Sequence, residues 1–367
     1  MTATTERVGT TPARRPSSKS SLRRSETALV GLVAVITLVA AATLSDFRTL
    51  SNINNLLSTT ALIAIVAIGE AVVILARQID LSVGAILGIC AYVVGEESGH
   101  FSGALGPIMG VLMALGLGAA FGIGNALLVD ALKMPAIIAT LATLSIYTGL
   151  QIIVNNGSQL YLTQVPRWLA GLRGNAWLGV GTFIWIAAIC LVAVSFLLRM
   201  TRFGRDVYAL GSNPDAAVYL GVRVRLRTYQ LFALCGALAG LGGLLYTSEY
   251  GNVDATAGSG LNLTVIAAAV VGGVSLFGGS GTAVSAVLGA LLLGEIQNIL
   301  ELTRLSIFAE QTLQGAAIVT AVAVYAVASR RLRRPVAREQ MLSVHVDPGR
   351  AGGAGRRARR LGSGIAR

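Results

Sequence analysis

The chain has 367 residues, of which 54% are hydrophobic, 13% are charged and 44 are glycine, and its mean hydropathy is +0.71. Soluble domains carry about 25% charged residues, so this composition excludes a soluble enzyme, a disordered chain and a disulfide-rich secreted module. An integral membrane protein remains, and the length accommodates about ten spans of ~20 residues with short loops.

The net charge of +12 is concentrated in the two tails. Residues 1–26 hold six Lys/Arg against two acids, and residues 330–367 hold eleven Arg against two acids. We predict that the tails, residues 1–26 and 329–367, are disordered cytoplasmic segments that lie next to anionic lipid headgroups. The residues between the tails carry almost no net charge, so the basicity belongs to the tails, and we favour this interpretation over nucleic-acid binding.

Ten apolar runs follow one another between the tails. Continuous apolar runs must satisfy their own backbone hydrogen bonds in a bilayer, so we predict helices and no spanning strands. The first run has no small-residue cleavage site after it and is predicted to be a retained anchor. The predicted fold is an all-α integral membrane protein with a transmembrane domain over residues 27–328. The runs are 27–44, 56–76, 81–95, 105–129, 135–154, 177–198, 228–248, 261–276, 282–300 and 311–328.

The distribution of Lys and Arg predicts the topology. If the N-terminus is inside and ten helices alternate, 25 of the 29 basic residues lie on the cytoplasmic side. Only Arg48, Arg167, Arg173 and Arg304 lie outside. The positive-inside rule therefore favours an even number of helices with both termini in the cytoplasm of a bacterial cell.

Two loops are long and polar. Residues 155–176 are predicted to lie outside, and residues 199–227 form the longest predicted inside loop. Within the inside loop, Asn213-Pro214 is a helix-start signal, so we predict a short cytoplasmic helix over residues 214–220 that ends at Gly221.

The third and eighth runs are short and flanked by glycine or polar residues. They occupy equivalent positions in helices 2–5 and 7–10, whose orientations are opposite. We therefore hypothesise an inverted repeat, in which paired short helices mark a substrate pathway near the middle of the membrane.

Few ionisable residues lie within the spans. Glu70, Asp80 and Glu295 are functional candidates because a charge in a bilayer is costly. Asp80 also fits an N-cap of the third helix, and Glu70 and Glu295 face either the pathway or a polar partner. The predicted pathway residues are Glu70, Asn125, Asn262, Glu295 and Asn298.

Glycines cluster around the eighth and ninth runs, and Gly116, Gly118, Gly122 and Gly124 recur at helical spacing on the fourth. We interpret them mainly as sites of close helix packing. No P-loop, no nucleophile elbow and no metal-binding motif occurs, so we expect neither an enzyme nor a bound cofactor.

Four segments resemble a known family. IDLSVGAILG (79–88), MPAIIATLATLSIYTGL (134–150), VYALGSNPDAAVYLGV (207–222) and VIAAAVVGGVSLFGGSGT (265–282) occur in the order found in ABC sugar-importer permeases of the ribose, xylose and rhamnose type. The resemblance spans about residues 50–325. Its structural motif residues here are Asp80, Ser82, Gly84, Gly272, Gly273, Gly278 and Gly279.

The resemblance implies a permease subunit that works with three kinds of partner. These are a second permease subunit, a cytoplasmic ATPase that binds ATP in place of this chain, and an extracytoplasmic sugar-binding protein. The loop over residues 211–221 resembles the segment that docks into the ATPase. The corresponding coupling residues are Gly211, Asn213, Asp215, Ala216, Ala217 and Gly221.

The sequence also departs from the family pattern. Arg77-Gln78 stand where the family usually has Gly-Gly, Asn262 and Thr264 stand where it often has acids, and Glu295 is often absent from it. Asp254-Ala255 favours a rhamnose-like or autoinducer-2-like monosaccharide as substrate. Alternatives are a permease for nucleosides or branched-chain amino acids, and an ion-driven secondary transporter, which usually carries more paired charges in its spans.

Overall fold

The computed structural model describes residues 18–303 apart from 101, 102 and 175, together with eight positions between 309 and 323. The chain divides into two compact units, Met1–Ile318 and Val319–Arg367, and all the helices and strands discussed below belong to the first. The tenth predicted run and the C-terminal tail lie largely or wholly outside the described residues.

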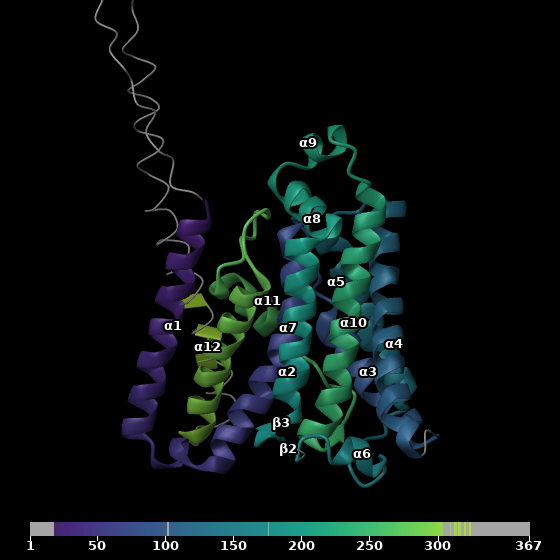
Figure 1. Cartoon of the computed structure of the whole chain (residues 1–367). Helices are drawn as coiled ribbons and strands as arrows, with labels where there is room; N and C mark the ends of the chain where they lie inside the picture. The colour runs from purple at the N-terminus through teal and green to yellow at the C-terminus, as the bar shows by residue number, and fades with distance from the viewer. Residues whose placement is uncertain are drawn as a thin grey trace, which may run out of the picture. The chain divides into compact units, whose positions relative to one another are not determined.

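Helices dominate the first unit (Figure 1). The long helices match the predicted apolar runs, because each run is a continuous stretch that only a helix can carry across a bilayer. Within the described residues, seven helices are long and apolar enough to cross a membrane. These seven are α1 (Ser18–Thr43), α2 (Leu50–Leu75), α4 (Gly106–Ala131), α5 (Ala136–Asn155), α7 (Thr182–Met200), α10 (Val224–Tyr250) and α12 (Ala283–Leu302).

The third and eighth runs form shorter helices, as predicted. Helix α3 spans Val83–Glu97, and α11 spans only Leu261–Gly272. The remaining elements are small. They are η1 (Ser45–Arg48), η2 (Ser98–His100), η3 (Gly103–Leu105), α6 (Arg167–Ala170), α8 (Arg202–Ser212), α9 (Pro214–Tyr219), β1 (Leu160–Tyr161), β2 (Ala176–Trp177), β3 (Val180–Gly181) and β4 (Asn252–Val253).

Two differences from the sequence prediction concern boundaries. Helix α1 begins at Ser18, so residues 18–26, which we expected in a disordered tail, are helical. The sixth run begins as the antiparallel hairpin β2–β3, and its helix α7 starts only at Thr182. Hydropathy marks where a chain is apolar, and a helix can continue past that limit or start inside it.

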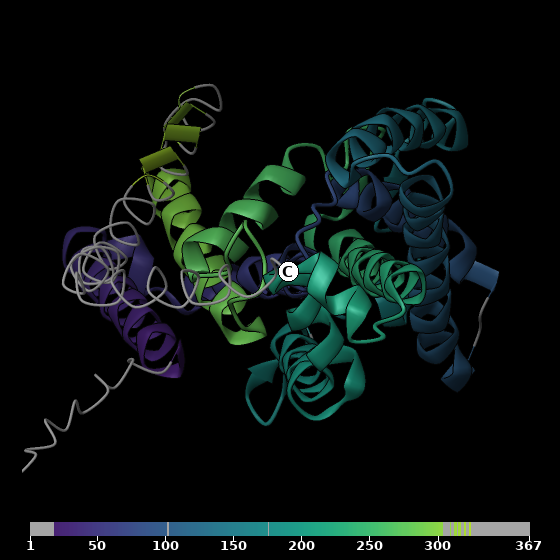
Figure 2. The same cartoon turned by 90° about the horizontal axis from the view of Figure 1, so that it is seen from above.

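Helices α2 and α10 form the interior of the unit. The buried share of the apolar stretch is 83% in α2 and 78% in α10, but only 17–28% in α1, α4, α5 and α7. The four exposed helices present large apolar side chains outward, which is the pattern of helices that face lipid. In the view from above, purple α1 and yellow-green α12 lie side by side, and α4 packs along α10 away from them (Figure 2).

Glycine brings α4 and α10 close together. Gly118 and Gly122 of α4 face Gly236 and Gly240 of α10, and a Cβ added at any of the four would overlap backbone atoms of the opposite helix. Small residues at a spacing of four permit this approach in a membrane protein. The packing interpretation of the α4 glycines holds for these two and for Gly124, where an added Cβ would lie 2.8 Å from the Tyr147 hydroxyl of α5, whereas Gly116 has no neighbour within 4 Å of an added Cβ.

The small elements gather at the two ends of the long helices (Figure 1). We call the end that carries α8 and α9 the α9 end, and the end that carries α6, β2 and β3 the α6 end. In the predicted topology the α9 end is cytoplasmic and the α6 end is extracytoplasmic.

Candidate functional site

A buried polar cluster joins α2, α4 and the turn before α3. Asp80 Oδ1 accepts from the backbone N and the hydroxyl of Ser82 at 2.9 and 2.7 Å, and Asn125 Nδ2 donates to Asp80 Oδ2 at 2.9 Å. Glu70 Oε1 accepts from the backbone N of Asp80 at 3.1 Å. All four residues have no solvent exposure. Such a network holds the turn in one conformation, because each lost partner would leave a buried polar group unsatisfied.

The prediction that Asp80 is the N-cap residue of the third helix is wrong. Helix α3 begins at Val83 and its N-cap is Ser82, whose side chain accepts no capping bond. Asp80 lies two residues before that cap and receives the Ser82 N–H from the turn. The difference arises because the chain after α2 folds back into the interior before α3 starts.

The two short helices meet at their N-termini. Asn262, the second residue of α11, donates through Nδ2 to the carbonyl of Leu81 at 3.1 Å. Gly84 of α3 lies against the backbone of Gly258, where an added Cβ would approach the Gly258 oxygen at 2.5 Å. The starts of the two short helices are therefore adjacent in space, and the inverted repeat stays a prediction.

The other two pathway candidates lie elsewhere. Asn298 and Asn52 exchange reciprocal amide hydrogen bonds of 2.8 and 2.9 Å, which join α12 to α2. Glu295 accepts from the hydroxyl of Thr37 and so joins α12 to α1. The five predicted pathway residues thus do not gather at one site. Glu70 and Asn125 belong to the buried cluster, Asn262 lies next to it, and Glu295 and Asn298 bind neighbouring helices.

The loop between α11 and α12, residues 273–282, is rich in glycine and lies against the α9 end. We call it the glycine loop. Gly273, Gly278 and Gly279 have φ values of 115°, 75° and 71°, a left-handed region that favours glycine. A Cβ added at Gly272 would overlap the carbonyl of Ser285. The backbone N of Gly279 donates to the carbonyl of Leu75 at 2.9 Å, so the loop is bonded to the end of α2.

The predicted inside loop is ordered over most of its length. Asn213 caps α9 by accepting from the backbone N of Ala216 at 3.1 Å, and Gly221 follows the helix with a φ of 80°. The short helix predicted from Asn213-Pro214 is therefore confirmed. Helix α8 was not predicted, although its burial of Phe203, Val207 and Leu210 on one face is an amphipathic helical pattern.

The surface of α9 is divided between an inner and an outer face. Asp215 and Ala216 are exposed, but Ala217 is 1% exposed and packs within the chain. The apolar side chains Val218, Tyr219 and Leu220 are exposed at 56%, 91% and 79%. Of the predicted coupling residues, Gly211 and Ala217 are thus interior and can act on a partner only through their neighbours.

Three backbone segments meet beneath α9. Gly211, near the end of α8, lies so close to the carbonyl of Leu75 and to the backbone of Gly279 that an added Cβ would overlap them. Tyr208 donates its hydroxyl to the carbonyl of Gly281 at 2.9 Å, and burial raises the pKa of that hydroxyl, which keeps the proton in place. We call this meeting of α8, the end of α2 and the glycine loop the three-way junction.

Arg77 strengthens the three-way junction in a way that glycine would not. Its φ is 63°, in the left-handed region that favours glycine, the residue that the resemblance led us to expect here. Its Nε donates to the carbonyl of Phe277 at 2.6 Å, and its Nη2 donates to the carbonyl of Ser212 at 3.3 Å. One side chain thus links the α2–α3 turn to the glycine loop and to the end of α8.

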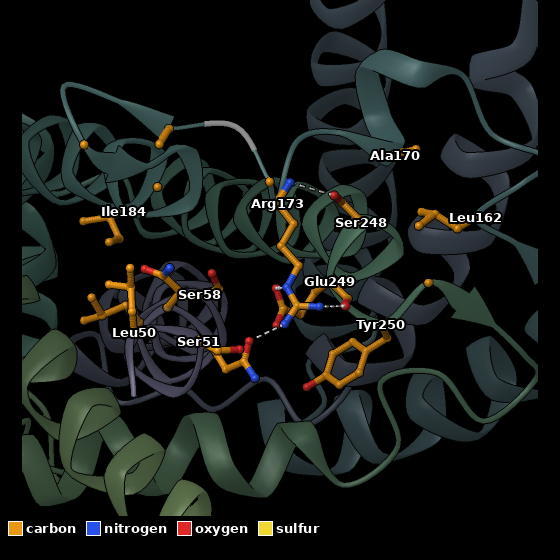
Figure 3. A pocket seen from close by; sticks show the side chains of 18 residues that line it. Leu50, Ser51, Ser58, Leu162, Ala170, Arg173, Ile184, Ser248, Glu249 and Tyr250 are labelled. Carbon is orange, nitrogen blue, oxygen red and sulfur yellow. Dashed lines mark hydrogen bonds and ion pairs between the residues drawn. The ribbon is translucent and has the colours of Figure 1, made fainter. Parts of the chain in front are cut away.

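A pocket of about 660 Å³ opens at the α6 end. Its walls come from the start of α2, the segment after α6, the β2–β3 hairpin and the end of α10 (Figure 3). In Figure 3 the Arg173 side chain reaches toward Glu249, with Tyr250 beside them. Sequence reasoning missed this site. The one available signal was that Arg173 is among four basic residues on the predicted outer side.

Long apolar helices with exposed apolar side chains, two short helices that meet inside the unit and an ordered loop at the α9 end are features of a multispanning membrane protein. Residues 52–322 match the family described as "Branched-chain amino acid transport system / permease component". The chain belongs to this family and is an integral membrane permease subunit, as the sequence predicted.

Curated relatives agree with this assignment. The chain is 39% identical over 241 residues to the Autoinducer 2 import system permease protein LsrC of Yersinia enterocolitica, and the match covers 66% of each chain. The protein of the same name from two strains of Yersinia pseudotuberculosis is 39% and 38% identical over 66% of this chain and 67% of the relative. The chain thus spans about two thirds of the length of these relatives. No solved structure matches it.

Proposed function

We propose that this chain is the membrane subunit of an ATP-driven importer for a small carbohydrate-like solute. ATP is bound and hydrolysed by a separate cytoplasmic subunit that docks on α9. A second permease subunit, identical or homologous, completes the pathway, and an extracytoplasmic protein delivers the solute. This chain contributes the route through the membrane and the mechanical connection to the ATPase.

The exposed apolar surface of α9 is the observation that carries the proposal. Val218 and Tyr219 form the end of the short, capped helix α9, and Leu220 follows directly after it, at the tip of the α9 end. Contiguous exposed apolar side chains at a polar end of a membrane protein are typical of a protein contact. The three-way junction lies directly beneath, so a displacement of α9 would be transmitted by backbone contacts to α2 and α11.

The names of the relatives support a proposal for the substrate. The LsrC proteins are named for autoinducer 2 import, and we carry that solute over as the favoured substrate, with rhamnose-like sugars next. Branched-chain amino acids are the second candidate class, because the description of the family names them. Uptake of labelled autoinducer 2, L-rhamnose and L-leucine into cells that express the complete system distinguishes the classes.

Copurification tests the docking surface. Tyr219→Asp and Ala216→Arg place a charge in an apolar contact, and we expect recovery of the ATPase with the permease to fall about tenfold or more. Tyr161→Asp is the matched control, because Tyr161 is also exposed and lies at the α6 end. Equal recovery of the ATPase with both tyrosine variants would contradict the proposal.

A further inference from the structure

We propose that the pocket at the α6 end binds a neutral polyhydroxylated solute before it crosses the membrane. The inference rests on the proposed function for the direction of transport and for the substrate class. It adds a site in the chain itself, formed by residues that neither the family match nor the sequence motifs single out.

The charges in the pocket are already paired. Arg173 Nε lies 3.2 Å from Glu249 Oε2, and Arg173 Nη1 donates to the backbone carbonyl of Glu249 at 3.3 Å. Arg173 Nη2 donates to Asn55 Oδ1 at 2.6 Å, and its backbone N donates to Ser248 Oγ at 3.0 Å. Among the described lining residues these are the only two with a charge. The pocket is therefore close to neutral and has no unpaired cation for a carboxylate.

Neutral hydrogen-bonding groups surround the ion pair. Ser51, Asn54, Asn55, Ser58 and Tyr250 line the pocket and offer hydroxyl and amide groups, which can both donate and accept. This mixture matches sugar hydroxyls, each of which also donates and accepts. A branched-chain amino acid would instead require separate partners for its ammonium and carboxylate and an apolar recess for its side chain.

The ion pair in the wall is shielded from the space of the pocket. The Glu249 side chain is 5% exposed, and its Oε2, which forms no hydrogen bond, is itself buried and lies 3.2 Å from Arg173 Nε. A solute would therefore be held by the neutral groups of the wall. The volume of about 660 Å³ is within the range of about 300–1,000 Å³ usual for small-molecule sites.

The position of the pocket suits a solute that arrives from outside. It lies at the α6 end, which is the predicted outer side, and opposite the α9 end. Its walls come from α2 and α10, the two buried helices, and from the β2–β3 hairpin before α7. A bound solute would thus contact the same helices that reach the three-way junction and the buried cluster.

Ligand-observed saturation-transfer NMR on the full-length permease in nanodiscs tests binding without any partner. The probes are autoinducer 2, L-rhamnose and L-leucine at millimolar concentration. Asn54→Leu removes one amide, and Tyr250→Phe removes one hydroxyl, while Arg173 and Glu249 keep their contacts. We expect each variant to raise the Kd for the polyhydroxylated probes about fivefold, the usual effect of one lost hydrogen bond. Tyr161→Phe removes an exposed hydroxyl outside the pocket and leaves the Kd unchanged.

Three outcomes overturn the proposal. They are an absence of signal from both polyhydroxylated probes on the wild-type chain, an unchanged Kd in both pocket variants, and a pocket-dependent signal from L-leucine alone. None of them affects the ATPase copurification of the Tyr219 and Tyr161 variants. Conversely, a failure of the copurification test would contradict docking of the ATPase on α9 and would leave the NMR result on the pocket unaffected.

Discussion

The two ends of the molecule are built in opposite ways. At the α9 end, α8, the end of α2 and the glycine loop touch through backbone atoms, and Gly211 has no room for a Cβ. At the α6 end, side chains surround a pocket of about 660 Å³, and an added Cβ at Gly181 meets nothing within 4 Å. Backbone segments in direct contact can transmit a displacement, whereas an open pocket can admit a solute. The difference therefore agrees with the proposal that the α9 end couples to the ATPase and that the α6 end receives the solute.

The largest expected effect concerns which side of the membrane each end occupies. Tyr161→Cys at the α6 end and Tyr219→Cys at the α9 end introduce exposed thiols into a chain whose native Cys90, Cys190 and Cys235 are buried. A membrane-impermeant thiol reagent added to intact cells should label the first variant, and it should label the second only after permeabilisation. The reverse pattern would overturn the predicted topology and place the pocket in the cytoplasm.

A smaller effect is expected from adding one methyl group at each end. Gly211→Ala forces backbone segments apart and should destabilise the fold by about 1–3 kcal/mol, the usual cost of overpacking. Gly181→Ala has open space and an ordinary φ of −59°, so its melting temperature in detergent should equal that of the wild type. Equal melting of the two variants would show that the α9 end is as loosely built as the α6 end.

The smallest effect is expected at Arg77, where strain and hydrogen bonding oppose each other. Arg77→Ala loses the bonds to Phe277 and Ser212 but keeps the left-handed φ, so it should destabilise by about 1–2 kcal/mol. Arg77→Gly loses the same bonds but relieves the backbone strain of up to about 1 kcal/mol, so it should fall closer to the wild type. Chemical denaturation of both variants measures the difference, and a less stable Gly variant would contradict this account.

Hydropathy predicted most of the fold because a bilayer leaves few choices. Each long helix was visible as an apolar run, since the backbone must bond to itself where there is no water. The N-cap of α9 could also be predicted from the sequence, because Asn213 and Pro214 determine the helix start through contacts within one turn. Helix α8 was missed because a polar amphipathic helix between two spans carries no such run.

The sequence by itself thus determined what depends on neighbours along the chain: the apolar helices, the short third and eighth helices, the capped α9 and the membership of a permease family. Only the tertiary structure decided which distant residues meet. Asp80 pairs with Asn125 across 45 residues, Arg173 pairs with Glu249 across 76, and Ala217 turns inward while Tyr219 remains exposed. The physical reason is that helix packing selects the partner of each polar side chain, and the pairing energy is gained only after the helices have come together.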